Sequence, residues 1–407
     1  MKLQIASPGE FPPGLDLPWQ VPLERWEHPD LVRLTRGISR NVVRFVAHRD
    51  AVYAVKEMHE RLAEREYGLL RSLVELGLPV VEPVCLATER AGEGARGLLV
   101  TRYLDHSLPL RSLISGGASA GQAANLIDAV GDLLVRLHLA GFFWGDCSLS
   151  NTLFRLDAGH YAAYLVDAET GELHPSLSDG QRAHDLLIAS ENIAGELMDL
   201  QEGYGLPELI DPVGLAGTLA PAYERLWEEI QRVEVYPANR QDLVEARLRH
   251  LNALGFDIEE MEIETLPEGL IQVRARPAEG GHHRRLVRQL LGLDAQENQA
   301  RRLLNDMYAY RAWQTGVQGK DVPVVVSAYR WLHEIYRPTL EAVPAEQREK
   351  LEDPEIFHQI LEHRWYMSER EGREVALDEV IPSYVKNILE PMPEPTVEAG
   401  GLAPSED

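Results

Sequence analysis

The sequence predicts an α+β protein in which a small β-rich lobe precedes a larger helical lobe and a mostly α-helical C-terminal domain. Strand-like runs with two-residue alternation crowd residues 41–103 around one helical stretch. From about Gly121 to Gly203 the apolar residues recur mainly at helical spacing. The 407 residues are enough for two or three domains, each with its own core.

Composition and charge exclude several classes of protein. The chain has 40 Lys+Arg against 65 Asp+Glu, a net charge of −25, and this field argues against bulk nucleic-acid binding. No run approaches the roughly 18–20 apolar residues of a membrane span, and the N-terminus lacks a signal-peptide pattern. We therefore expect a cytoplasmic protein without a membrane span. Cys85 and Cys147 are too few for a disulfide framework or a four-cysteine zinc site.

The N-terminal elements follow in order. Residues 1–30 are rich in proline, which predicts an extended arm or a cover strand. The next domain, expected over residues 31–204, has strands at residues 41–48, 51–56 and 98–103. Between them, a helix over about Arg61–Leu76 is predicted by an apolar stripe. A core helix is predicted over Ala124–His138, with Gly141 available to end it. The stripe of the first helix comprises Leu62, Leu69, Leu70, Leu73 and Leu76.

The C-terminal domain is expected over residues 205–389. Helices are predicted at about residues 222–233, 240–254, 284–313, 323–336 and 354–368, with a β-hairpin near residues 260–276 that turns at Leu266–Gly269. The aromatic residues Tyr308, Tyr310 and Trp313 are expected to pack inward beside a basic helix face, and Trp365 and Tyr366 to lie in the core. Residues 390–407 lack a basic residue and are expected to form a disordered acidic tail.

Two charged residues of the β-rich lobe are expected to pair. Lys56 shares a strand face with Val52 and Ala54, so its ammonium should point into a covered site that needs an anion. Glu66 lies on the apolar stripe of the following helix, and a carboxylate on an inward face requires a cation. Lys56 is the nearest candidate.

The helical lobe adds three polar residues in a fixed order. Asp146 and Asn151 stand five positions apart in GFFWGDCSLSNTLF, and Asp167 follows a short apolar strand in YLVDAETG. An aspartate to take a hydroxyl proton, an asparagine and an aspartate to hold Mg²⁺, and a lysine on the phosphates are the parts of kinase-type phosphoryl transfer. A tetra-anionic nucleotide and its metal demand these residue types.

The ordered set resembles the protein-kinase-like superfamily, in the branch of lipopolysaccharide (Kdo) kinases, RIO kinases and aminoglycoside phosphotransferases. The resemblance covers about Leu31–Gly203, and it points to a bacterial family that joins a bilobal kinase-like half to a C-terminal domain of unknown function. It implies ATP and Mg²⁺ as cofactors. Position by position, it places Lys56 on the phosphates, Glu66 as the anchor of Lys56, Asp146 as catalytic base, and Asn151 with Asp167 on Mg²⁺.

The sequence departs from the family pattern at three places. Trp144 replaces the usual histidine before the catalytic Gly-Asp, and the metal-binding triplet is Asp167-Ala168-Glu169. The phosphate-covering loop has only Gly37, so Ser39, Arg40 and Asn41 are expected to supply donors to the nucleotide. Glu169 is either a further metal ligand or a residue facing solvent.

Two functions stay open at this point. The first is a phosphotransferase acting on an unknown hydroxyl acceptor, which could be a small molecule, a sugar or a protein. The second is a nucleotide-binding pseudokinase or scaffold whose C-terminal domain binds a partner. Asp185 is expected to bond the backbone of the catalytic loop. The pairs His282-His283 and His358/His363 have no accompanying ligand spacing, so surface histidines are expected rather than a metal site.

Overall fold

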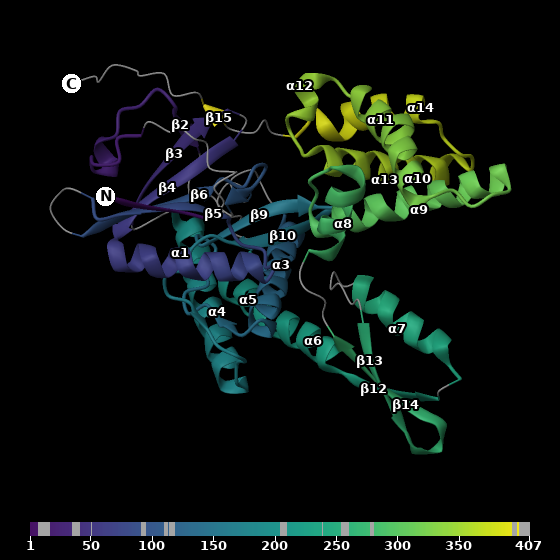
Figure 1. Cartoon of the computed structure of the whole chain (residues 1–407), viewed down its shortest axis with the longest axis horizontal. Helices are drawn as coiled ribbons and strands as arrows, with labels where there is room; N and C mark the ends of the chain where they lie inside the picture. The colour runs from purple at the N-terminus through teal and green to yellow at the C-terminus, as the bar shows by residue number, and fades with distance from the viewer. Residues whose placement is uncertain are drawn as a thin grey trace. The chain divides into compact units, whose positions relative to one another are not determined.

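The computed structural model describes residues 1–6, 17–34, 41–49, 51–90, 95–109, 113, 119–203, 210–237, 239–253, 260–276, 281–392 and 397–398 (Figure 1). The chain forms two compact units. Unit 1 comprises Met1–Arg155, Tyr161–Trp227 and Thr396–Asp407, and unit 2 comprises Leu156–His160 and Glu228–Pro395. The predicted domain boundary at residues 204/205 falls outside the described residues, and the compact units divide later, between Trp227 and Glu228.

Unit 1 opens with a seven-stranded antiparallel sheet in the order β1-β5-β6-β4-β3-β2-β15. Its central strand β4 (Ala51–His59) lies between β3 (Val42–His48) and β6 (Arg96–Arg102), so that Lys56 stands opposite Val43 and Leu99. The outer strands are β1 (Lys2–Ile5), β5 (Pro83–Thr88), β2 (Leu31–Leu34) and β15 (Val397–Glu398).

The N-terminal arm packs on this sheet. β1 pairs with β5, and the short helix η1 (Leu23–Arg25) follows. Leu17, Leu23 and Trp26 are buried in one cluster with Val55 and Val100 of the sheet. At the other end of the chain, Val397–Glu398 form a strand, β15, that pairs with β2.

Helix α1 (Glu60–Glu75) packs against β4, β5 and β6, beneath the sheet in Figure 1. Its predicted stripe is partly wrong, because Leu62 and Leu76 are exposed. The buried face is displaced round the helix from these leucines, and it satisfies the same helical spacing. Glu66 is buried on it, as predicted, together with Ala63, Tyr67, Leu70 and Leu73.

The helical lobe of unit 1 is built on α3 (Ala120–Leu139) and α4 (Asp179–Gly203). A capping box of Ser119 and Gln122 starts α3. Gly141 follows its end with φ +82°, where a Cβ would lie 2.1 Å from the His174 carbonyl oxygen, so glycine is required. The remaining elements are β7 (Leu108–Pro109), β8 (Phe142–Phe143), β9 (Thr152–Asp157), β10 (His160–Leu165), β11 (Glu172–Leu173), α5 (Pro212–Ala216) and α6 (Leu219–Gln231).

Unit 2 begins with a three-stranded sheet and one helix, α7 (Gln241–Ala253). The predicted hairpin is present as β13 (Glu260–Leu266) and β14 (Leu270–Arg276), with a 3₁₀ turn, η2 (Pro267–Gly269), between them. A strand that periodicity did not indicate, β12 (Val233–Pro237), pairs with the other side of β14.

Residues 281–392 of unit 2 are mainly helical. The single helix predicted at residues 284–313 is wrong: Gly292 takes a left-handed conformation, φ +67°, and separates α8 (His282–Leu291) from α9 (Glu297–Gln318). The other helices are α10 (Val324–Trp331), the π-helical η3 (Leu332–Tyr336), α11 (Arg337–Glu341), α12 (Ala345–Arg348), α13 (Asp353–Glu371), α14 (Leu377–Tyr384) and the π-helical η4 (Val385–Leu389).

The aromatic core of unit 2 differs from the one expected. Trp331, Tyr336 and Phe357 are buried and in mutual contact, with ring centroids 5.0–5.5 Å apart. Trp313, Trp365 and Tyr366 are instead more than half exposed, and Tyr308 is exposed as well. These four rings lie on helix faces directed away from the core, which periodicity alone did not separate from the inner faces.

The turn between β9 and β10 belongs to unit 2, where two carboxylates fix it. Asp157 accepts hydrogen bonds from the backbone N–H groups of Asn298 and Gln299 in the first turn of α9. Glu355 of α13 accepts from the N–H groups of Ala158 and Gly159. Burial raises the pKa of Asp157 to about 6 against the lowering effect of these bonds.

Candidate functional site

The site of unit 1 centres on Lys56. Its Nζ lies 3.0 Å from Glu66 Oε2, 2.6 Å from Asp167 Oδ2 and 3.8 Å from Glu169 Oε2. Lys56 reaches this point because it lies in the middle of the central strand, whereas Glu66 comes from the inner face of α1. The predicted contact between Lys56 and Glu66 is therefore present, and Asp167 joins it across 111 positions of sequence.

Burial of these charged groups shifts their pKa values. Only 1% of the Glu66 side chain and 13% of the Lys56 side chain is exposed. Burial, and then the charge of Asp167, raises the pKa of Glu66 to about 8 despite the nearby ammonium. For Lys56, burial lowers the pKa, but Glu66 and Asp167 together outweigh it, so the net shift is upward and the lysine stays charged.

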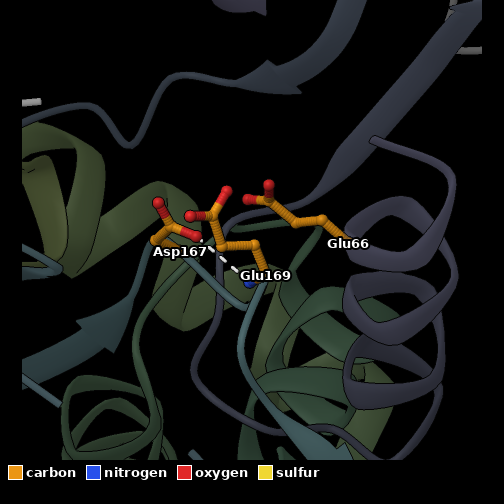
Figure 2. Close-up of side chains that lie close together, drawn as sticks. All are labelled: Glu66, Asp167 and Glu169. Atoms are coloured by element: carbon orange, nitrogen blue, oxygen red, sulfur yellow. Dashed lines mark hydrogen bonds between the residues drawn. The ribbon is translucent and has the colours of Figure 1, made fainter. Parts of the chain in front are cut away.

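Three carboxylates surround this single ammonium. Oxygen atoms of Glu66, Asp167 and Glu169 lie within 4.8 Å of one another. Figure 2 shows their carboxylate groups gathered at one place. The backbone N–H of Glu169 donates to Asp167 Oδ1, at 3.1 Å. When all three are ionised, one positive charge among them leaves two negative charges in surplus. A divalent cation carries the charge that would balance this surplus.

Glu169 faces this cluster, which bears on the two alternatives left open for it. Its Oε2 atom is buried and has no hydrogen-bond partner among the described residues. A buried carboxylate oxygen without a donor is costly, and a hard cation prefers ligands of this kind. The donor set thus fits Mg²⁺, with Asp167 and Glu169 as candidate ligands.

The loop between β8 and β9 carries Asp146 and Asn151. The Asn151 side-chain amide donates to the Asp146 carbonyl at 3.0 Å and approaches its carboxylate at 3.5 Å. The Asn192 side-chain amide donates to the other Asp146 carboxylate oxygen at 3.3 Å. The Asn151 carbonyl accepts from Val166 N–H, which joins this loop to the chain immediately before Asp167.

One buried and one partly buried acid of α4 hold the same loop. Asp185 accepts from the backbone N–H groups of Trp144 and Gly145 at 2.7 and 2.8 Å, the contact that the sequence predicted for it. Glu196 accepts from Leu149 N–H at 2.7 Å and from Ser150 N–H, and burial raises its pKa. Both ends of the loop are therefore fixed to one helix, with Asp146 between them.

Trp144 links the loop to the segment that carries Asp167. It is fully buried, and its indole Nε1–H donates to the Asp167 carbonyl at 2.9 Å. Thr170 in turn donates to the Trp144 carbonyl at 3.0 Å. A tryptophan in place of histidine therefore still ties the two segments together.

Sequence reasoning found only part of this site. It paired Lys56 with Glu66 and assigned Asp167 to the same site, but it did not predict the contact between Lys56 and Asp167. It also missed Asn192 and Glu196, because polar residues on a long helix carry no signal of the loop they face. Of the predicted nucleotide-cover residues, Ser39 and Arg40 lie outside the described residues, and Asn41 directly precedes β3. The roles of all these residues toward nucleotide and metal stay predictions.

Comparison with known proteins gives two separate matches. Residues 46–189 match the lipopolysaccharide kinase (Kdo/WaaP) family, and residues 225–389 match a domain of unknown function, DUF4032. None of the helices in the described part of the chain is both long and apolar enough to cross a lipid bilayer.

Curated relatives support the first match. The chain is 35% identical over 108 residues to proteins named 3-deoxy-D-manno-octulosonic acid kinase from Xanthomonas euvesicatoria pv. vesicatoria (strain 85-10) and Xanthomonas axonopodis pv. citri (strain 306). This segment is 26% of the chain and spans 41% of the length of each relative.

Among solved structures, "WaaP in complex with acyl carrier protein" is similar at 18% identity and a TM-score of 0.34, covering 54% of this chain and 89% of that one. The predicted resemblance to the Kdo branch is confirmed by the family match and the curated relatives. Residues 46–189 are thus similar to the Kdo/WaaP lipopolysaccharide kinase family, and residues 225–389 are similar to the DUF4032 domain.

Proposed function

We propose that this protein is an ATP-dependent phosphotransferase of the kinase-like type, with Mg²⁺ as its metal and a hydroxyl group as acceptor. The observation that carries the proposal is the Lys56 ammonium, bonded to a buried Glu66 and to Asp167, with Glu169 beside them. The kinase relatives support the same reaction class. We also propose that the protein is cytoplasmic.

Each residue has a role that its position allows. Glu66 holds Lys56 extended toward the nucleotide, where the ammonium neutralises the phosphates. Asp167, Asn151 and Glu169 are the proposed Mg²⁺ ligands, and the metal would neutralise charge on the phosphates when it is bound. The orientation of Lys56 by β4 and of Glu66 by α1 provides the positioning on which this chemistry depends.

Asp146 is the proposed base. Its carboxylate oxygens are held by the amides of Asn151 and Asn192, which orient it without neutralising its charge. An acceptor hydroxyl that lies within hydrogen-bond reach of Asp146 would pass its proton there as the oxygen attacks the γ-phosphorus. The phosphorus–oxygen bond to ADP breaks in the same step.

The acceptor is proposed only by class. The curated relatives carry the name of a sugar acid kinase, so a sugar hydroxyl is the first acceptor to test. The DUF4032 domain is proposed to select or position the acceptor.

The direct test is transfer of the γ-phosphoryl group from ATP to water, to the protein itself or to an added sugar. We expect Mg²⁺-dependent turnover by the wild type. Binding of Mg·ATP without any transfer would instead support the scaffold function, with the C-terminal domain as the functional part.

A further inference from the structure

Three buried side chains form a hydrogen-bonded chain behind the catalytic loop. His138, near the end of α3, lies between Asp185 of α4 and Tyr223 of α6. Its Nε2 is 3.1 Å from Asp185 Oδ2, and its Nδ1 is 2.9 Å from the Tyr223 hydroxyl. The side chains of His138 and Asp185 have no exposed surface, and Tyr223 is 1% exposed.

The direction of each hydrogen bond follows from the groups involved. The Asp185 carboxylate accepts from Trp144 and Gly145, so its bond with His138 is satisfied when imidazole Nε2 carries the hydrogen. In a neutral imidazole Nδ1 is then an acceptor, and the Tyr223 hydroxyl is the donor that meets it. Burial raises the pKa of Tyr223, which keeps this hydroxyl protonated. Tyr223 therefore selects the histidine tautomer that donates to Asp185.

Packing fixes Tyr223 at this place. Its ring stacks on Trp227, one turn further along α6, with centroids 5.7 Å apart and planes at 13°. Trp227 also contacts the Arg182 guanidinium of α4, whose central carbon lies 4.1 Å from the centre of the Trp227 ring. The aromatic pair thus holds α6 to the helix that carries Asp185.

The position of Tyr223 in the chain shows which segment of the protein supplies this contact. The match to the lipopolysaccharide kinase family ends at residue 189, and the DUF4032 match begins at residue 225. Tyr223 lies between them, yet it belongs to unit 1. A segment outside both matched regions therefore completes the support of the catalytic loop.

We propose that Tyr223 and His138 are positioning residues for phosphoryl transfer, because they orient the Asp185 carboxylate that holds the loop backbone directly before Asp146. This inference rests on the proposed function of Asp146. Removal of the Tyr223 hydroxyl leaves the buried Nδ1 of His138 without its donor. The imidazole is then no longer held in the tautomer that donates from Nε2 to Asp185. The loop backbone would then be held less firmly, and Asp146 would meet the acceptor in a poorer geometry.

The test compares Tyr223→Phe with wild type in the full-length chain. This change keeps the ring that stacks on Trp227 and removes only the hydroxyl. We expect kcat to fall by roughly 10-fold to 100-fold, the range for a displaced catalytic group, while KM for ATP stays within about 3-fold. The backbone amides of Trp144 and Gly145 should exchange hydrogen faster.

Tyr336→Phe is the matched control. Tyr336 is a buried tyrosine of unit 2 whose hydroxyl has no hydrogen-bond partner within the described part of the chain. It should leave kcat and the loop amides unchanged. A second comparison uses His138→Gln, which can present an N–H toward Asp185, and His138→Phe, which cannot; the glutamine variant should retain more turnover.

Equal kcat and equal amide exchange in Tyr223→Phe and Tyr336→Phe would overturn the proposal. If wild type itself transfers no phosphoryl group, the proposed function fails, and amide exchange then decides the positioning role separately. Faster exchange at Trp144 and Gly145 in Tyr223→Phe would support that role, and unchanged exchange would refute it.

Discussion

Replacement of Glu66 by glutamine tests the electrostatic strain of the site. Glu66→Gln keeps the shape of the side chain and an oxygen that can accept from Lys56, but it cannot ionise, so it never adds a third negative charge to the cluster. In wild type, burial is the main cause that raises the pKa of the Glu66 carboxyl group from 4.5 to about 8. The folded chain therefore holds a proton on Glu66 at pH values where the unfolded chain has lost it.

The sign and size of the effect follow from linkage. Because the folded pKa is raised, the contribution of this group to stability is complete below about pH 4.5 and is lost as pH rises through about 8. A shift of this size corresponds to roughly 3–5 kcal/mol at about 1.4 kcal/mol per pKa unit. The free energy of unfolding of wild type should fall by this order between pH 5 and pH 8 relative to Glu66→Gln.

Urea unfolding of both proteins at several pH values measures this difference. Glu64→Gln, on the exposed side of the same helix, is the control and should follow wild type. Parallel pH profiles for wild type and Glu66→Gln would refute the reasoning, because they would mean that Glu66 titrates alike in the folded and unfolded chains.

Three further changes address the other parts of the account. Lys56→Met leaves the carboxylate cluster without its ammonium and should lower the free energy of unfolding by about 3–5 kcal/mol near pH 8. The double variant with Glu66→Leu should recover this stability. If the effects of the two single changes were additive, Lys56 and Glu66 would not be partners. Asp167→Asn should abolish the Mg²⁺ dependence of ATP affinity while the fold stays intact, and unchanged affinity by calorimetry would exclude Asp167 as a ligand. In unit 2, Glu355→Gln should speed amide exchange at Ala158 and Gly159, because the free energy of local opening falls by about 1–3 kcal/mol. Unchanged exchange would mean that the carboxylate does not hold this turn.

Local pattern was enough to predict the elements that position the main site residues. The alternation in β4 aimed Lys56 inward, and the helical spacing of α1 put Glu66 on the buried face even though Leu62 and Leu76 proved to be exposed. The hairpin of β13 and β14 was predicted because its turn residues interrupt two alternating runs.

Features that depend on tertiary contact could not be predicted in this way. The inward direction of Glu169 follows from the turn after Asp167, and the pairing of His138 with Tyr223 joins residues 85 positions apart. The break at Gly292 was missed because the apolar period continues across it from α8 to α9. These are the places where packing, rather than periodicity, decides the structure.

The most direct test of the central claim is the separation of nucleotide binding from turnover in Asp146→Asn. A base that acts on the acceptor hydroxyl makes little contact with the nucleotide, so Mg·ATP affinity should stay within a few fold of wild type. Turnover should fall by roughly 10²-fold or more. Cys147→Ser, at the buried neighbouring position, controls for disturbance of the loop and should be nearly silent. Equal turnover by Asp146→Asn and wild type, measured side by side with radiolabelled ATP, would contradict the account.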